Sequence, residues 1–512
     1  MRISLRSNGF NVCQRILESI MLFNSYIFII FFLPITWLMF FLAARYRKVD
    51  VSAGILVVAS LIFYSYWNPK FVLLILFSIA FNYAAGRCLE KAGGSRAKVY
   101  LILGIAVDLG LIGYFKYANF FLENISHLAD RPFQPRDIFL PLGISFFTFQ
   151  QIAYLLDCYK GLTKENRLVH YALFVSFFPQ LIAGPIVHHG DIIPQFKKEH
   201  TYRINYQNIA LGLCFFSLGL FKKTVIADSF SSWVAEGFDS DAQLTLLESW
   251  GASLSYAFQI YFDFSGYSDM AIGLGYFFNI ELPLNFNSPY KATSIIDFWR
   301  RWHITLSAFL RDYLYIPLGG NRKGPVRRFV NLLVVMLLGG LWHGASWTFV
   351  FWGFLHGFFM CVNHLFRKIF QRINYTLPSA AAWCLTFVSV TFAWVFFRAE
   401  SFNRALDICK GMLGFNGVVL RSDHLPDSVA AVLHKLNIQT VWVGKWHLDP
   451  PEQRNMLIIA FIICLFLPNV REWSDQTMKT RPRLFAAVVV GCALFTAFIF
   501  TGRVAEFLYY QF

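Results

Sequence analysis

Charged residues are scarce in this sequence of 512 residues. Asp, Glu, Lys and Arg together make up 15% of it, whereas 56% is hydrophobic and 19% is aromatic. Soluble domains contain about 25% charged residues, and a soluble chain of this length could not hide so much apolar surface. The composition therefore excludes a soluble domain and predicts bilayer spans of about 20 residues each. Basic loops between the spans account for the net charge of +15, so nucleic acid is not an expected partner.

Several motifs of known chemistries are also missing. The nine cysteines contain no CxxC pair and no metal-type spacing, so neither a disulfide framework nor a metal site is expected. The chain lacks an HxxxxD acyltransferase motif, a GxSxG nucleophile elbow, a Walker A loop and a dinucleotide fingerprint. These absences exclude a serine hydrolase of the soluble type and a nucleotide-driven pump.

Long apolar runs predict an all-α, polytopic membrane protein with about 12 transmembrane helices. Residues 1–20 contain three arginines but no apolar core, so they are interpreted as a tail or extension and not as a cleaved signal peptide. Basic residues follow the first and third runs, which places Met21 and the C-terminal end outside the cytoplasm. The apolar runs lie at residues 24–44, 51–67, 70–86, 99–122, 139–157, 170–187, 207–227, 250–280, 329–347, 348–366, 380–397, 455–469 and 484–502.

The polar stretch at residues 297–328 carries the densest group of candidate functional residues. Aromatic residues alternate there with Arg300, Arg301 and His303. The simplest interpretation is an amphipathic helix that lies in the membrane interface. A turn with two glycines follows, and it leads into a cluster of cations, which could bind a polyphosphate ligand or could be an ordinary basic cytoplasmic loop. These cations are Arg322, Lys323, Arg327 and Arg328.

A histidine lies deep within the apolar run that starts near residue 329. His343 belongs to the sequence GGLWHGASW and would lie about 20 Å along a helix from its cytoplasmic end. An ionisable residue at that depth is a functional-site hypothesis by default. Gly339, Gly340 and Gly344 would let another backbone or a thin substrate approach closely. The alternative is a histidine that is hydrogen-bonded in a helix–helix contact.

Two carboxylates, Asp263 and Asp269, lie inside another apolar run. Buried carboxylates at membrane depth cost at least about 2.5–3.5 kcal/mol, so they need partners, and Arg300 or Arg301 could supply them. A structural ion pair is the simplest interpretation. These aspartates together with His303 and His343 would also suit an ion relay, so a secondary transporter or flippase is the alternative function. No internal repeat supports a transporter.

Residues 297–324 and the sequence LLGGLWHGASW closely resemble the membrane-bound O-acyltransferase family, in its bacterial branch of alginate O-acetylases and peptidoglycan O-acetyltransferases. The resemblance extends from about Met21 to the last residue. Further segments that fit this branch are GYFKYANFF at 113–121, LPLGISFFTFQ at 140–150, FFPQLIAGPI at 177–186, YFDFSGYSDMAIGLG at 261–275 and FLYYQF at 507–512.

The resemblance implies one transmembrane domain over residues 21–512, in which a ring of helices surrounds a thinned centre and two funnels meet at a histidine. The invariant histidine of the family matches His343, and the second histidine of the branch matches His303. The other residues then expected to bind substrate are Trp342, Arg300, Arg301, Arg322, Lys323, Asp263 and Asp269.

The resemblance further implies acetyl-CoA from the cytoplasm as donor, with no tightly bound cofactor. In a related D-alanylation system, a separate peptide offers a tyrosine to the acyl group. Here residues 484–512 form a last span and an aromatic tail, with Tyr509 at the matching position and Tyr510 beside it. Tyrosine has a pKa of about 10 and is a poor nucleophile at pH 7, so a histidine would take its proton. A periplasmic SGNH-type partner would then acetylate a polysaccharide such as alginate or peptidoglycan outside a bacterial inner membrane.

Overall fold

A computed structural model describes residues 21–46, 49–165, 167–421, 439–441, 450–499 and 508. These residues are mostly helical, which confirms the all-α prediction. The strands among the described residues are two short parallel ones, β1 (Val419–Arg421) and β2 (Gln439–Val441). The chain forms two compact units. The first contains residues 1–220, 267–284 and 474–511, and the second contains residues 221–266, 285–473 and 512.

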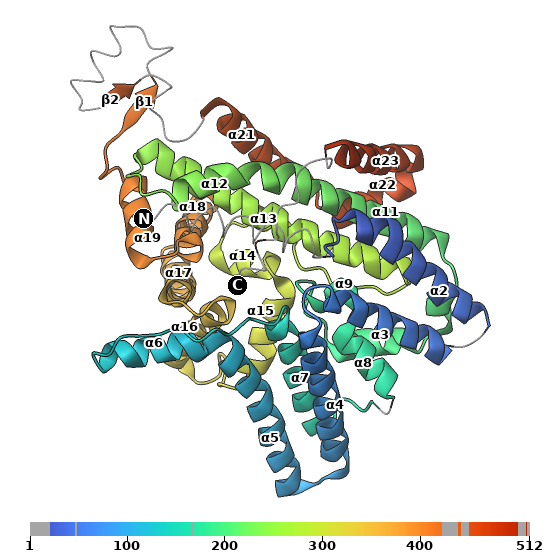
Figure 1. The fold of residues 1–512 in the computed structure, drawn as a ribbon. Coiled ribbons are helices and arrows are strands. Elements are labelled where there is room, and N and C mark those ends of the chain that lie inside the picture. Colours follow the sequence, from blue (N-terminus) through green and yellow to red (C-terminus); the bar gives the residue numbers. More distant parts are fainter. Residues whose placement is uncertain are drawn as a thin grey trace, which may run out of the picture. The chain divides into compact units, whose positions relative to one another are not determined.

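In the first unit, α4, α5 and α7 lie side by side (Figure 1). Polar side chains join them where water is absent: Asn82 donates to Asp108 at 2.8 Å, and Gln151 donates to Ser78 at 2.7 Å. Such bonds hold spans together because lipid provides no hydrophobic drive between helices. The helices of this unit are η1 (Ile27–Phe32), α2 (Leu33–Arg45), α3 (Val49–Ser65), α4 (Lys70–Lys91), α5 (Gly94–Ile112), η2 (Gly113–Tyr117), α6 (Ala118–Leu128), α7 (Ile144–Tyr159), α8 (Leu168–Ser176), α9 (Phe178–Leu181), α10 (His189–Phe196), η3 (Glu199–Tyr202), most of α11 (Tyr206–Phe221), the end of α13 (Leu246–Phe277), most of α22 (Val470–Thr480) and α23 (Pro482–Ile499).

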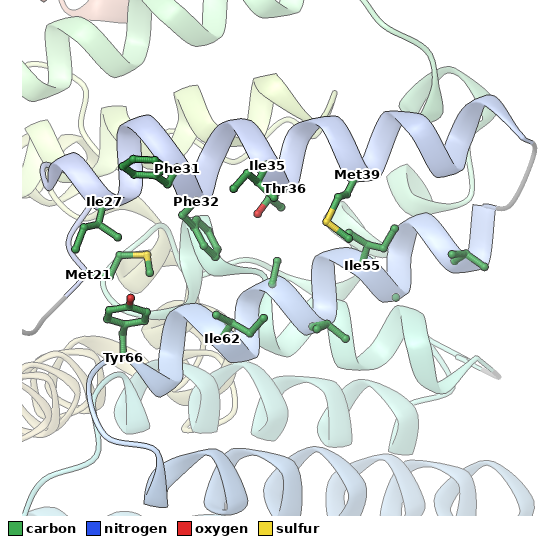
Figure 2. Close-up of a pocket in the computed structure, with 14 residues that line it drawn as sticks. Met21, Ile27, Phe31, Phe32, Ile35, Thr36, Met39, Ile55, Ile62 and Tyr66 are labelled. Atoms are coloured by element: carbon green, nitrogen blue, oxygen red, sulfur yellow. The ribbon is translucent and has the colours of Figure 1, made fainter.

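An apolar groove of about 610 Å³ runs between η1–α2 and α3. Figure 2 shows side chains of the two helices facing each other across it, among them Phe31 and Ile35 opposite Ile62. Large apolar side chains on its walls are exposed: Phe31 is 60% and Ile35 54% accessible. In water such a surface would be a liability, whereas in a bilayer it faces acyl chains.

The second unit contains the polar stretch and the deep histidine. Its α16 and α17 lie side by side (Figure 1) and cross through glycines. A Cβ on Gly340 would collide with the carbonyl oxygen of Phe349, and one on Gly353 with that of Met336. The helices of this unit are η4 (Lys222–Ala227), η5 (Asp228–Phe230), α12 (Ser231–Phe238), most of α13, η6 (Pro289–Lys291), α14 (Ile295–Arg301), α15 (Ile304–Leu310), η7 (Arg311–Tyr315), α16 (Gly324–His343), α17 (Trp347–Arg372), α18 (Ser379–Arg398), α19 (Phe402–Met412) and α21 (Pro450–Phe466).

Each apolar run of the sequence overlaps at least one helix, although the run at 170–187 is divided between α8 and α9 and continues beyond both. Among the described residues, seven helical segments are long and apolar enough to cross a bilayer, and α21 with α22 could supply an eighth as a bent pair. Two shorter apolar helices, Val49–Ser65 and Pro482–Ala493, add to these. The protein is therefore multi-pass, and a total of about 12 spans stays a prediction.

Candidate active site

His343 is the last residue of α16, and its side chain is buried with 3% exposure. The helix ends there because Gly344 adopts an extended conformation, and a Cβ on Gly344 would collide with the ring of Phe349. The glycines beside His343 therefore permit close approach, as the sequence predicts. At a helix C-terminus the aligned peptide dipoles place partial negative charge, which favours a cation nearby.

Aromatic rings enclose His343 within the second unit. The ring centroids of Trp342, Trp352 and Phe397 lie 4.9, 5.2 and 5.1 Å from its own. The imidazole of His303 lies 6.3 Å away, also between ring centroids. The two histidines predicted to be catalytic are thus brought together from positions 40 residues apart, within a cluster of buried aromatic side chains.

His303 is fully buried, and its backbone adopts a left-handed conformation with φ 43° and ψ 54°. This conformation is uncommon for a residue other than glycine, and such residues cluster at functional sites. It separates α14 from α15 and turns the imidazole toward the ring of Phe264, at 4.8 Å between centroids. The interpretation of this stretch as one amphipathic helix is therefore wrong, because the left-handed backbone at His303 separates α14 from α15.

Asn285 determines which nitrogen of His303 carries the proton. Its side-chain oxygen accepts hydrogen bonds from the backbone N–H of Thr305 at 3.4 Å and from the Thr305 hydroxyl at 3.0 Å. The same oxygen lies 3.1 Å from Nδ1 of His303. Because that oxygen can only accept, Nδ1 must donate, so the lone pair of the neutral ring is on Nε2. No sequence signal pointed to Asn285, which lies 18 residues before His303.

The cationic turn, residues 317–328, is shaped by glycine and by one buried asparagine. Gly319, Gly320 and Gly324 have φ angles of 106°, 51° and 85°, which other residues rarely adopt. The Asn331 amide, on α16, donates to the carbonyl oxygens of Leu318 at 3.3 Å and Gly320 at 3.1 Å. This fixes the turn on the start of α16.

Within the part of the chain that the structure describes, Arg322, Lys323 and Arg327 are exposed and pair with no acidic side chain. Arg328 is half-buried, with its guanidinium 5.1 Å from the ring centroid of Phe329. Three unneutralised cations at the start of a span could hold a polyanionic ligand.

Known proteins share this sequence over nearly its whole length. A peptidoglycan O-acetyltransferase of Helicobacter pylori is 43% identical, and the alignment covers 96% of this chain and 98% of that protein. The alginate O-acetylase AlgI of Pseudomonas aeruginosa is 37% identical, with coverage of 91% and 85%. The profile of the membrane-bound O-acyltransferase family matches residues 167–403. The chain belongs to this family. It is therefore an O-acyltransferase.

A more distant relative extends the comparison to a different acyl group. The teichoic acid D-alanyltransferase of Bacillus subtilis is 27% identical over 52% of this chain and 70% of its own length. The acyltransferase therefore has relatives whose names differ in both the acyl group and the acceptor. Membership of the family decides against the transporter interpretation of the buried aspartates and histidines.

The partner predicted for Asp263 in the acyltransferase is wrong. Asp263 pairs with Lys223 at 2.6 Å, and Lys223 also pairs with Asp228 at 2.8 Å. Arg301 instead pairs with Asp297, one helical turn away in α14, at 3.0 Å. Lys223 reaches α13 from the π-helical segment η4, whose geometry the apolar run around it did not reveal. Asp263 thus belongs to a buried ion-pair network, which favours a structural role.

The other predicted substrate-binding residues have different outcomes. Arg300 is exposed at the end of α14, and Trp342 is buried beside His343. Asp269 is buried in the part of α13 that belongs to the first unit, and its role in substrate binding stays a prediction. Tyr509 and Tyr510 lie outside the described residues, so the role of the tail stays a prediction. Trp352 and Phe397, which complete the aromatic wall, were missed because buried aromatic residues are common throughout the sequence.

Proposed function

We propose that this acyltransferase takes acetyl from cytoplasmic acetyl-CoA and passes it across the membrane, by way of Tyr509, for O-acetylation of an extracytoplasmic polysaccharide. The observation that supports this most strongly is the pair of buried histidines, His343 and His303, with the Nε2 lone pair of His303 set by Asn285. Peptidoglycan is the acceptor proposed first, because the relative that matches over 98% of its length carries that name. An alginate-like polymer is the second candidate, from the name of another relative.

The proposed reaction has two steps. A histidine takes the proton of the Tyr509 hydroxyl as its oxygen attacks the thioester carbonyl, the C–S bond breaks, and the CoA thiolate recovers the proton. The resulting aryl ester is an activated acyl donor. An SGNH-type partner then transfers the acetyl group to a sugar hydroxyl and leaves Tyr509 protonated again. The first step uses acid–base groups alone, which agrees with two buried imidazoles surrounded by aromatic rings.

This function can be tested in inside-out membrane vesicles. The vesicles are supplied with acetyl-CoA that carries a radiolabel in its acetyl group. When the partner is absent, we expect radiolabel to become covalently attached to the chain and CoA thiol to be released in equal amount. Supplying the partner and the polysaccharide should move the label to the sugar. If acetyl-CoA stays intact and the chain carries no label, the proposed donor is contradicted. If purified alginate is acetylated and peptidoglycan is not, the order of the two candidate acceptors is reversed.

The cationic turn provides a prediction about donor binding. We propose that Arg322 and Lys323 contact the CoA phosphates. Replacing both by glutamine should raise the apparent KM for acetyl-CoA severalfold with little change in kcat, since exposed ion pairs contribute about 0.2–1 kcal/mol each. Salt should reduce the difference between variant and wild type because it screens exposed charges.

The matched control removes the same charge from the same end of the α16–α17 hairpin. Arg367 and Lys368 are exposed near the end of α17, which runs antiparallel to α16 and ends where α16 begins. Their replacement by glutamine should leave KM unchanged. An equal rise in KM in both double variants would show that the cationic turn contributes only a general basic charge. No rise in either would show that the turn does not take part in binding acetyl-CoA.

A further inference from the structure

A second group of polar side chains gathers in the first unit, apart from the residues assigned above. Asp157 lies at the end of α7, His188 is the N-cap of α10, and His189 is its first residue. Asp157 and His189 are buried, with 3% and 4% exposure, whereas the His188 side chain is 40% exposed. One ligand atom from each residue lies within 4.8 Å of the others. The cluster is thus closed by protein on one side and open to solvent at His188.

The backbone at the start of α10 brings the two neighbouring imidazoles together. Consecutive residues of a helix point in different directions, but His188 is extended, with φ −91° and ψ 138°. This change of conformation lets both rings face Asp157, with their centroids 4.3 Å apart. Nε2 of His188 lies 2.6 Å from the Asp157 carboxylate, and Nδ1 of His189 lies 3.8 Å from the same oxygen.

The Nδ1 atom of His189 is the observation that points to a ligand. It is buried and has no hydrogen-bond partner within the described residues, although burying a polar atom without a partner is costly. It points at the Asp157 oxygen from 3.8 Å, which is too far for a hydrogen bond and suited to a shared ion. Tyr154 and Phe174 pack their edges on the His189 ring, at 5.8 and 6.3 Å between centroids, so the ring cannot easily turn to another partner.

We propose that Asp157, His188 and His189 bind one divalent metal ion of the Zn²⁺ class. Two imidazole nitrogens and a carboxylate oxygen are a ligand set that suits this ion, with water completing the shell on the open side. Bonds of about 2.0–2.2 Å in tetrahedral geometry place ligand atoms roughly 3.3–3.5 Å apart. The two separations from Asp157, 2.6 and 3.8 Å, lie on either side of that value, and all three ligand atoms lie within 4.8 Å of one another, so shifts of about 1 Å would complete the site.

Metal binding requires one proton to move within His188. The backbone N–H of Gly190 donates to Nδ1 of His188 at 3.2 Å, so without metal the proton is on Nε2 and faces Asp157. A metal on Nε2 needs the other tautomer, with the proton on Nδ1, and the hydrogen bond from Gly190 is then lost. Gly190 is exposed, so water can replace that acceptor. The ion would join α7 to the start of α10 and restrain the intervening chain.

Purified full-length protein in detergent, with an affinity tag that contains no histidine, provides the test. After EDTA treatment and dialysis, Zn²⁺ titration with elemental analysis should give one tightly bound equivalent. Co²⁺ should give the visible absorption of a site with nitrogen ligands, and metal should raise the melting temperature. His188→Ala and Asp157→Asn should each weaken the affinity by at least about tenfold, in line with the loss of a ligand or of its support.

His200→Ala is the matched control, because this histidine is exposed and lies just beyond α10 in η3. It should bind metal as wild type does. If Asp157→Asn fails to fold, His188→Ala decides, because the side chain of His188 is the most exposed of the three. Absence of a stoichiometric ion in wild type, or wild-type affinity in His188→Ala, would overturn the proposal.

Discussion

Replacing His343 by alanine is expected to abolish acetyl transfer while the protein stays folded and inserted. The residue ends α16 inside a ring of aromatic side chains and lies 6.3 Å, between ring centroids, from His303. General base catalysis contributes typically about 10²–10⁴-fold, so at most about a hundredth of the wild-type rate should remain. The measurement is acetyl transferred per mole of purified protein, and His343→Gln should give the same result with less loss of packing.

A different buried histidine separates loss of chemistry from loss of packing. His356 is fully buried and accepts a hydrogen bond from Trp299 at 3.2 Å, as expected of a histidine with a structural role. His356→Gln should lower the amount or melting temperature of the protein but leave the activity per folded molecule close to wild type. Wild-type activity in His343→Ala, or equal losses in the variants of both histidines, would contradict the catalytic assignment of His343.

The neighbours of His343 should show graded effects. His303→Ala removes the second imidazole and should reduce activity strongly. Asn285→Ala keeps that imidazole but removes the acceptor that sets its tautomer. One hydrogen bond is worth about 0.5–1.5 kcal/mol, and 1.36 kcal/mol corresponds to about tenfold in rate. We therefore expect Asn285→Ala to lose up to about tenfold in activity, because the ring can then adopt either tautomer.

The sequence predicts the helices well, because long apolar runs are a strong signal in a membrane protein. It predicts the break at His303 poorly, since a stripe of aromatic residues has the same spacing whether or not one residue inside it is left-handed. It also missed Lys223, because this residue lies inside the apolar run at 207–227 and nothing in the run marks it as a partner for a carboxylate. The π-helical geometry of η4 directs the Lys223 side chain to Asp263. The two residues are 40 positions apart, so no local sequence pattern encodes this contact.

In the candidate site, too, the sequence indicates residues that lie in local motifs and does not indicate residues that distant segments supply. His343 and His303 could be proposed from the sequence because each lies in a recognisable motif, and the glycines next to His343 indicated a close approach of two backbones. Asn285, Trp352 and Phe397 are supplied by separate elements, so their part in the pocket required coordinates. The cluster at Asp157 is a similar case, because the carboxylate precedes the two histidines by about 30 residues and no metal-binding spacing marks it.

The phenol oxygen of Tyr509 is expected to be essential for acetyl transfer. Lys479 and Arg481 precede α23 and Arg483 lies in its first turn, and the 18 residues of this helix span about 27 Å, nearly the thickness of a bilayer core. The chain end would then lie outside the cytoplasm, where a short, uncharged aromatic tail could fold back toward a buried histidine. An aromatic belt at the interface would have the same composition, so the composition of the tail alone does not separate the two roles.

Removing one oxygen atom from Tyr509 distinguishes a nucleophilic tail from an aromatic belt. Tyr509→Phe keeps the ring and its membrane affinity but removes the nucleophile, so acetylation should disappear with no loss of protein. Tyr510→Phe is the matched control and should have a mild effect. When the partner is absent, peptide mass spectrometry should find the mass of one acetyl group on the C-terminal peptide of wild type and not on that of Tyr509→Phe. An active Tyr509→Phe variant and an unmodified wild-type tail would together leave the tail as a membrane anchor, and the acetyl group would have to pass from CoA to its acceptor without a tyrosyl ester.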